Sequence, residues 1–437
     1  MEIQVLKLRN ALGLLEGLAA AKTRQTKTST TSSRTRHGKA KVVKDTVPAI
    51  LSNILLQDGQ AIATDLDTAI SVYLPEVVGQ YLVPCKPVSK MLRYVHGDEM
   101  LTLEMRGGSL HMAWKGGAAN YQIEKAQDYP VIPQVVPMAR FSVLSDALIP
   151  AMLELLDYAA EEVERPVLNG VSLFLGSPLE IAAGDGYRMA YKTLPISMNP
   201  SGGINTIIIP SRAVLQLAHI WEKEPKAANP LDDSLIGQIA NKGAVGLDVS
   251  NSMLKATYGR VSLITRTVDG TPPNFKQLIP AEMPNAVQIY APDLDRAVNR
   301  LYDAAVHTKG IVRLSWTNGT MTLTVNDDST VTVESTIPVQ TLNGEGHIAL
   351  NIKYLREYIR DRSGLVVMAT KDVSSPAVFR QGNSPVVVIM PMFVQWPDQA
   401  SAQQPAPPEA AAAPASEDKD EITEQELESA TEQEAAA

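Results

Sequence analysis

The sequence has few of the residues that build disulfide frameworks, metal centres or aromatic cores. It contains a single cysteine, Cys85, so no intramolecular disulfide can form, which is typical of a reducing, cytoplasmic environment. The six histidines are scattered, and none lies at metal-ligand spacing from another, which argues against a zinc site. Aromatic residues make up only 5% of the chain, so aliphatic side chains must form most of any core.

Long apolar runs and short catalytic motifs are also missing. No apolar run approaches the roughly 20 residues of a membrane-spanning helix, and the N-terminus has no basic stretch ahead of its apolar part. We therefore expect no membrane association and a cytoplasmic protein. No G-x-S-x-G, P-loop or zinc motif occurs, so we predict neither a metal nor a cofactor. With 45% hydrophobic and 20% charged residues, the 437-residue chain can build several domain cores.

The net charge of −9 is unevenly distributed. Residues 22–45, here called the basic insertion, hold eight basic residues and one acid among Ser, Thr and Gly. Residues 398–437, the acidic tail, hold eleven acids and one lysine in an Ala- and Pro-rich context. Neither composition can bury a core, so we predict that both segments are disordered.

Three segments of the chain share one pattern. Residues 3–20, 141–160 and 287–305 each begin with a short alternating strand and continue as a helix with apolar residues at three- and four-residue spacing. Later in each unit a strand runs into a second helix, through Val83-Pro84 in the first and Ile209-Pro210 in the second. The remainder of each unit is rich in strands and turns.

These repeats predict an α+β fold with three domains, each of two helices plus antiparallel sheets. Proline-rich joints at residues 128–133 and 274–280 separate the units, and we expect them to be extended. The predicted boundaries are residues 1–138 with the basic insertion at 22–45, 139–283, 284–397, and the disordered tail 398–437.

The stretch GDGYRMA, residues 184–190, places an aspartate between two glycines. Asp185 could be a catalytic acid, a metal ligand or the first residue of a tight turn. Asp65 occupies the same place in the first repeat, which suits a turn better than chemistry, because Asp side chains accept hydrogen bonds from the backbone just ahead of them. The catalytic alternative is a soluble hydrolase that uses Asp185 with Asp65 or Asp67 as a carboxylate pair.

The repeats and their order resemble one known family. The stretches LSNILL, ATDLDTAISVYLP, RPVLNGVSL, DGYRMA and VVIMPM, read in this order over residues 1 to 394, resemble the bacterial sliding clamps, the beta subunits of the replicative DNA polymerase. In that family two three-domain chains close head to tail into a ring around double-stranded DNA. The ring tethers the polymerase and has no catalytic activity. A paralogue that serves another polymerase or a repair factor would carry the same pattern.

The resemblance also implies partners and a partner site. A separate clamp loader opens the ring, and the polymerase catalytic subunit and other proteins with a clamp-binding motif insert a short peptide between the second and third domains. Met and Leu suit such an adaptable pocket. The matching positions are Arg165, Leu168, Gly186, Tyr187, Arg188, Met189, Pro273, Gln277, Leu278, Asn351, Tyr354, Ser374, Pro376, Val388, Met390, Pro391 and Met392.

Three positions near this predicted groove depart from the family pattern. Gly184 stands where Thr is usual, Gln277 where a basic residue is common, and Phe393 where Arg often follows MPM. These changes leave the predicted fold unaffected. They bear on which peptide sequence the groove prefers.

A ring that slides must attract phosphates without reading bases, which Lys and Arg side chains achieve. Acidic residues on the first helix of the second unit, such as Glu154 and Asp157, speak against a uniformly basic lining. We also hypothesise that the basic insertion contacts DNA. The predicted DNA-binding residues are Lys7, Arg9, Arg24, Arg34, Arg36, Lys39, Lys41, Lys44, Lys90, Arg93, Arg212, Arg296 and Arg300.

Overall fold

A computed structural model of the chain describes residues 1–19, 48–161, 165–224, 243–327 and 331–394. The chain divides into two units, Met1–Phe393 and Val394–Ala437, and the fold given below is that of the first. The basic insertion lies outside the described residues, as does the acidic tail.

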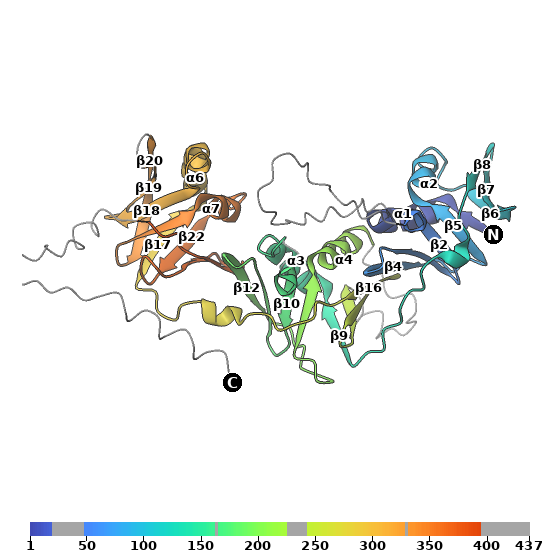
Figure 1. Cartoon of the computed structure of the whole chain (residues 1–437), viewed down its shortest axis with the longest axis horizontal. Coiled ribbons are helices and arrows are strands. Elements are labelled where there is room, and N and C mark those ends of the chain that lie inside the picture. Colours follow the sequence, from blue (N-terminus) through green and yellow to red (C-terminus); the bar gives the residue numbers. More distant parts are fainter. Residues whose placement is uncertain (20–47, 162–164, 225–242, 328–330, 395–437) are drawn as a thin grey trace, which may run out of the picture. The chain divides into compact units, whose positions relative to one another are not determined.

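The first repeat begins with a strand that runs directly into a helix, as the sequence predicts (Figure 1). Leu8, Leu12 and Leu15 of that helix are buried, because their spacing places them on one face. The strands form two sheets, ordered β1-β6-β7-β8 and β5-β2-β3-β4. The elements are β1 (Glu2–Gln4), α1 (Val5–Ala19), β2 (Asn53–Gln57), β3 (Gln60–Thr64), β4 (Thr68–Tyr73), β5 (Gln80–Pro84), α2 (Cys85–Leu92), β6 (Met100–Arg106), β7 (Ser109–Trp114) and β8 (Gly117–Gln122).

The second repeat has the same order of elements. Its strands follow the orders β13-β10-β11-β12 and β16-β15-β14-β9. The elements are β9 (Ala139–Leu144), α3 (Ser145–Leu156), β10 (Gly170–Phe174), β11 (Leu179–Gly184), β12 (Arg188–Leu194), β13 (Thr206–Pro210), α4 (Ser211–Lys223), β14 (Ala244–Val249), β15 (Met253–Tyr258) and β16 (Val261–Arg266).

The third repeat differs in one long strand. β20 pairs with β19 through its first part and with β17 through its last part, so it connects the two sheets of the repeat. The elements are β17 (Asn285–Tyr290), α6 (Ala291–Val306), β18 (Ile311–Thr317), β19 (Thr320–Asp327), β20 (Val331–Asn343), β21 (Gly346–Asn351), α7 (Ile352–Ile359), β22 (Leu365–Thr370), β23 (Ala377–Arg380) and β24 (Val386–Ile389).

The first joint follows a turn of 3-10 helix, η2 (Ala126–Asp128), and has no helix over residues 130–133. The second joint is less extended than predicted, because it contains a turn of 3-10 helix, η4 (Phe275–Leu278). Each turn sets a buried aromatic ring against a sheet. Tyr129 packs with Leu55 and Leu82, and its hydroxyl accepts a hydrogen bond from the backbone N–H of Thr64 at 3.2 Å. Phe275 packs with side chains of β11, β12 and β24. Two further 3-10 turns are η1 (Ala49–Ser52) and η3 (Pro166–Leu168).

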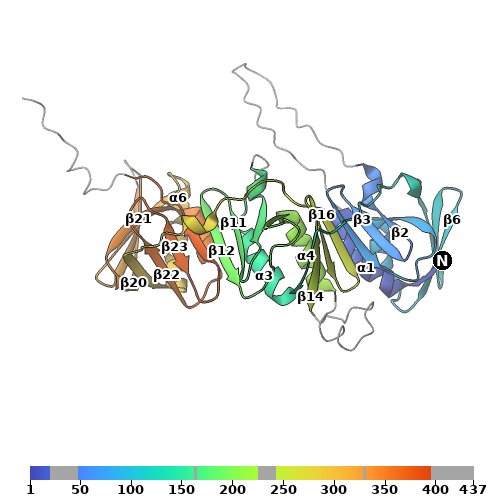
Figure 2. The same ribbon diagram turned by 90° about the horizontal axis from the view of Figure 1, so that it is seen from below.

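Sheets continue across both junctions between repeats. β4 of the first repeat pairs antiparallel with β16 of the second, and β12 of the second pairs antiparallel with β24 of the third (Figures 1 and 2). In each repeat the two helices pack against one another. Strand pairing therefore joins the repeats edge to edge. Within the described ranges, no helix is long and apolar enough to cross a membrane.

Candidate functional site

The two repeated aspartates, Asp65 and Asp185, fold the turns in which they lie. The Oδ1 atom of Asp185 accepts hydrogen bonds from the backbone N–H groups of Tyr187 and Arg188, both at 2.9 Å. Asp65 Oδ1 accepts from the N–H groups two and three residues ahead, at 3.2 and 2.7 Å. Gly186 has a φ of +94°, which glycine adopts without strain. The prediction of a turn rather than a catalytic acid is confirmed.

Arg188, the first residue of β12, joins three separate segments beside this turn. Its Nε donates to Asp185 Oδ2 at 3.1 Å, and its Nη2 donates to the backbone carbonyl of Asp157, after α3, at 2.8 Å. Its Nη1 lies 2.6 Å from Oε2 of Glu357 in α7. The side chain of Arg188 is only 10% exposed, so water screens these contacts weakly.

Two tyrosine rings enclose the same guanidinium group. The Cζ atom of Arg188 lies 4.7 Å from the ring centroid of Tyr354 and 5.3 Å from that of Tyr158. Tyr187 is 60% exposed and stacks on Tyr354, with 6.4 Å between the ring centroids. Burial, and then the charge of Asp185, raises the pKa of Tyr354.

A cavity of about 500 Å³ lies beside these rings. Four of the predicted groove residues line it: Arg165, Tyr187, Arg188 and Tyr354. The other lining residues fall into two classes. Three are apolar, namely Leu156, Ala159 and Ala160, and the rest carry charges of both signs, namely Asp157, Glu161, Asp185, Lys353, Glu357 and Arg360.

Apolar side chains continue from the turn along the junction of β12 and β24. Met189 and Val388 lie opposite one another in the strand register, and both are buried together with Phe275. Leu278 and Met390 remain 47% and 42% exposed. The structure therefore presents apolar surface at two of the predicted groove residues, above a core formed by others.

The remaining predicted groove residues surround this junction. Asn351 caps α7, because its side-chain oxygen accepts the N–H of Lys353 at 2.9 Å. Ser374 lies in the turn after β22, where its hydroxyl donates to Asp372 at 2.7 Å. The N–H of Met390 donates to the carbonyl of Tyr187 at 2.9 Å. Leu168 is buried, Pro273 and Gln277 are exposed, and Gly186, Pro376, Pro391 and Met392 lie in loops.

Packing explains why residue 184 is glycine. A Cβ atom at Gly184 would lie 3.0 Å from Cε1 of Phe275 and 3.1 Å from Cβ of Met189. The ring of Phe275 occupies the space that a threonine side chain would need. The departure from the family pattern at residue 184 is therefore matched by the aromatic residue of the joint.

The comparisons with known sequences match this architecture. Residues 156–274 match the family model for the central domain of the DNA polymerase III beta subunit. The beta sliding clamp of Synechococcus elongatus is 25% identical over 358 residues, which cover 78% of this chain and 88% of the relative. The beta sliding clamp of Pseudomonas aeruginosa is 22% identical over 327 residues, covering 72% and 83%. The chain is therefore similar to the beta sliding clamps over most of its length, and its residues 156–274 match the model of their central domain.

Solved structures of such clamps share the fold. The DNA polymerase III beta subunit of Thermotoga maritima superposes with a TM-score of 0.73 at 17% identity, covering 90% of this chain and 99% of that one. The subunit from Pseudomonas aeruginosa gives a TM-score of 0.73 at 20% identity with the same coverage. The predicted α+β architecture of repeated clamp domains is confirmed.

The predicted DNA-binding residues of α2 are exposed. Lys90 and Arg93 are both open to solvent, and so is Lys86, four residues before Lys90. The spacing of these three residues places them on one helical face. Lys86 was not among the predicted residues, although its spacing from Lys90 is a signal that the sequence contains.

Other predicted DNA-binding residues are engaged within the clamp. Arg9 donates to the carbonyls of Leu92 and Val95, at 2.5 and 2.6 Å, and so caps the end of α2. Arg300 lies 3.5 Å from the hydroxyl of Ser335. Lys7 pairs with Glu76, Arg212 with Asp65 and Arg296 with Asp293. Arg24, Arg34, Arg36, Lys39, Lys41 and Lys44 lie outside the described residues.

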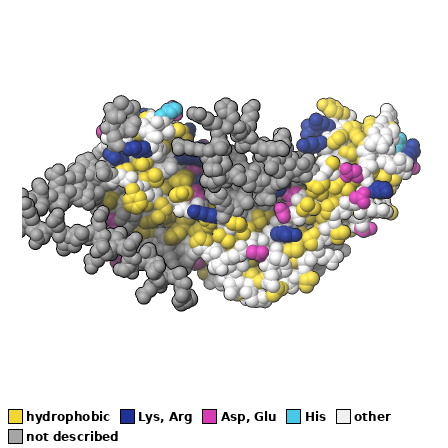
Figure 3. Space-filling view, in the orientation of Figure 1, with side chains coloured by type: hydrophobic (Ala, Val, Ile, Leu, Met, Phe, Trp, Pro, Cys, Tyr) yellow, Lys and Arg dark blue, Asp and Glu magenta, His cyan; other side chains and the backbone are white. Residues whose placement is uncertain are grey.

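On the face shown in Figure 3, the visible Lys and Arg side chains are scattered among hydrophobic and acidic ones. They do not gather into one patch on this face.

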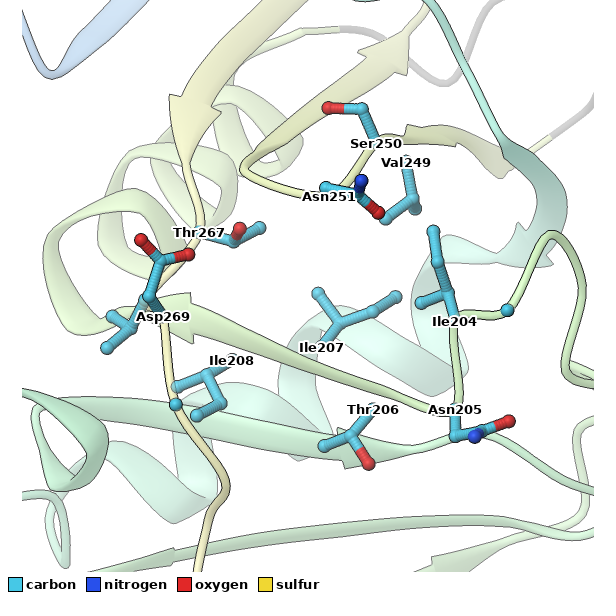
Figure 4. A pocket seen from close by; sticks show the side chains of 13 residues that line it. Ile204, Asn205, Thr206, Ile207, Ile208, Val249, Ser250, Asn251, Thr267 and Asp269 are labelled. Atoms are coloured by element: carbon cyan, nitrogen blue, oxygen red, sulfur yellow. The ribbon is translucent and has the colours of Figure 1, made fainter.

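A second cavity, of about 210 Å³, lies inside the second repeat between β13, the β14–β15 turn and the segment after β16 (Figure 4). Polar side chains such as Ser250, Asn251 and Thr267 surround it, and Asp269 is its one ionisable lining residue. Hydrolysis by paired carboxylates needs two such groups. Because Asp65 and Asp185 are also taken up by their turns, the described part of the chain gives no support to the hydrolase alternative.

Sequence reasoning missed three contributors to the site: Asp157, Tyr158 and Glu357. Glu357 follows Tyr354 by three residues, so helical spacing could have placed both on one face. Asp157 contributes a backbone carbonyl, which no side-chain pattern reveals.

Proposed function

We propose that this protein is a non-catalytic processivity clamp that encircles double-stranded DNA as a homodimer and tethers the replicative DNA polymerase. Its similarity to beta sliding clamps supports the function. The observation that supports a closed ring is the pairing of strands at the junctions between repeats.

Each junction pairs the same two strands of the repeat. The last strand of one sheet, β4 or β12, pairs with the last strand of the next repeat, β16 or β24. In the described chain, the equivalent strand β8 ends its sheet, and the first part of β20 pairs only with β19. Pairing β8 of one copy with β20 of another, twice, would close two chains into a ring.

Sequence-independent DNA binding then falls to cations on the helices. Lys90 of α2 and Arg93, which caps its C-terminal end, are the best placed of the predicted residues, because both are exposed. Contacts of this kind position DNA without reading its sequence and weaken with salt.

The cavity beside Tyr187 and the exposed Leu278 and Met390 support a groove for partner peptides. Its proposed occupants are the polymerase catalytic subunit, the clamp loader and other proteins with a clamp-binding motif. Stacked tyrosines supply oriented contact area, and methionine adapts to different side chains.

Retention on circular DNA tests the ring directly. The clamp is loaded onto circular duplex DNA by a bacterial clamp loader with ATP and passed through a sizing column in high salt. We expect it to stay with the circles and to leave after a restriction enzyme linearises them. Loss from intact circles, together with a monomeric mass, would contradict the proposal.

The departures at Gln277 and Phe393 favour a second candidate, a paralogue that serves another polymerase or a repair factor. Phe393 is 92% exposed and places an apolar ring where a cation is usual. A pull-down with the purified replicative polymerase separates the candidates: capture supports the replicative clamp, and retention on circles without capture supports the paralogue.

A further inference from the structure

The repeated aspartates perform a second task besides folding their turns. At the first junction the other oxygen of Asp65, Oδ2, pairs with Arg212 in the first turn of α4, so the turn of one repeat is tied to a helix of the next. The Asp65 side chain is only 8% exposed. At the second junction Asp185 Oδ2 pairs instead with Arg188 of its own repeat, and Arg188 continues the connection to Glu357 in α7.

At both junctions ion pairs therefore connect an Asp turn to a helix of the next repeat, but the charged residues of that helix differ. Arg212 and Lys353 are both the second residue of their helices, while Gln216 and Glu357 are both the sixth. In α7 the sixth residue is acidic, and Arg188 lies between it and the turn. The side chain of Glu357 is 32% exposed, whereas that of Arg188 is 10% exposed.

Contacts within the chain already use all three nitrogens of the Arg188 guanidinium group, so few N–H donors remain for a partner. Of the five N–H donors of a guanidinium, Nε serves Asp185, Nη1 serves Glu357 and Nη2 serves the carbonyl of Asp157. Its faces lie against Tyr158 and Tyr354. What Arg188 does for the cavity is hold Tyr354 in place, and with it the stacked ring of Tyr187.

We infer that Glu357 is a positioning residue for the partner groove. Through Arg188 it fixes α7 of the third repeat against the Asp185 turn, and it thereby holds the rings of Tyr354 and Tyr187 in the orientation that binds a partner peptide. The inference rests on the proposed partner groove. If the inference holds, contacts at the junction between the second and third repeats determine the shape of the groove. Any shift of α7 relative to the Asp185 turn would then alter partner binding.

The test compares full-length Glu357→Gln with a matched control, Glu154→Gln. Glu154 also pairs with a cation at 2.6 Å, Lys192, but both of its elements belong to the second repeat. Two quantities are measured: affinity for the purified polymerase catalytic subunit by biolayer interferometry, and amide hydrogen exchange of residues 184–189. We expect Glu357→Gln to weaken binding about three- to tenfold and to speed exchange in the turn, because it removes one charged hydrogen bond. Glu154→Gln should do neither.

A double variant separates positioning from general destabilisation. In an Arg188→Ala background, Glu357→Gln should have no further effect on affinity, because its target is gone. An additive loss there, or exchange rates equal to those of Glu154→Gln, would overturn the inference. If the wild-type clamp fails to bind the polymerase subunit, the proposed groove is wrong. Amide hydrogen exchange of residues 184–189 then still tests whether Glu357 holds the Asp185 turn through Arg188.

Discussion

At the scale of single residues, close packing decides what a position tolerates. Gly184 has an ordinary strand conformation, so backbone freedom does not explain it. A Cβ atom at residue 184 would lie 3.0 Å from the ring of Phe275 and 3.1 Å from Cβ of Met189, so one of these neighbours would have to shift. The residue and the joint that covers it are therefore matched to each other.

Gly184→Ala tests this match. We expect it to destabilise the clamp by about 1–3 kcal/mol, because an added methyl must displace Phe275. Gly246→Ala is the control, since a Cβ atom in that strand would meet its nearest neighbour at 3.9 Å. Urea unfolding followed by circular dichroism measures both. Equal midpoints for the two variants would contradict the packing argument.

Cys85 provides a second prediction at this scale, because it is the only cysteine in the chain. It is fully buried, and burial raises the pKa of its thiol to about 11. A folded-state pKa above 9 keeps the thiol protonated at pH 8, and the thiolate is the reactive form. We expect no reaction with Ellman's reagent at pH 8 in the native clamp and one equivalent in guanidinium chloride. Rapid reaction of the native protein would show that this core opens.

At the scale of elements, helix α2 illustrates how one face can serve DNA while the other serves the fold. Cys85, Val88 and Leu92 are buried, and Lys86, Lys90 and Arg93 are exposed. Arg9 of α1 caps the carbonyl end of α2 and is committed to structure. We therefore expect Lys86, Lys90 and Arg93, rather than Arg9, to be available to phosphates.

Lys90→Ala/Arg93→Ala should weaken binding to duplex DNA and lower the slope of log affinity against log salt by about 1.8, because two phosphate contacts are lost. Fluorescence anisotropy over a salt series measures the slope. Lys115→Ala/Lys371→Ala removes two other exposed lysines and is the control. A similar change of slope in both double variants would mean that α2 has no special role.

At the scale of the whole molecule, the proposed ring closure uses the edge of β8. The two-residue turn between β7 and β8 makes Trp114 and Gly117 a hydrogen-bonded pair. Three residues further on, His111 and Asn120 form a pair without backbone hydrogen bonds, so the N–H of Asn120 points away from β7. That N–H is available to a strand of another chain.

Asn120→Pro should leave the β7–β8 hairpin intact and prevent dimer formation, because proline removes this outward donor. Asn120→Ala loses the same side-chain contact with His111 and should remain a dimer. Sedimentation velocity distinguishes a dimer from the 47.2 kDa monomer. A dimeric Asn120→Pro variant would mean that closure uses another edge.

Features that depend on a few neighbouring residues could be predicted from the sequence. The strand-to-helix openings, the paired helices and the Asp185 turn were all predicted correctly, because periodicity and turn chemistry act over a few residues. The division into three domains, the groove residues and the DNA-binding residues remain predictions.

The tertiary structure alone decided which groups meet. The pairing of Met189 with Val388 joins strands far apart in the sequence, and Glu357 meets Arg188, and Phe275 meets Gly184, across long stretches of chain. Whether a cation is free or committed, as for Arg93 against Arg9, also depends on such distant neighbours. Charge pairing and close packing act through space, so no pattern of adjacent residues could have specified them.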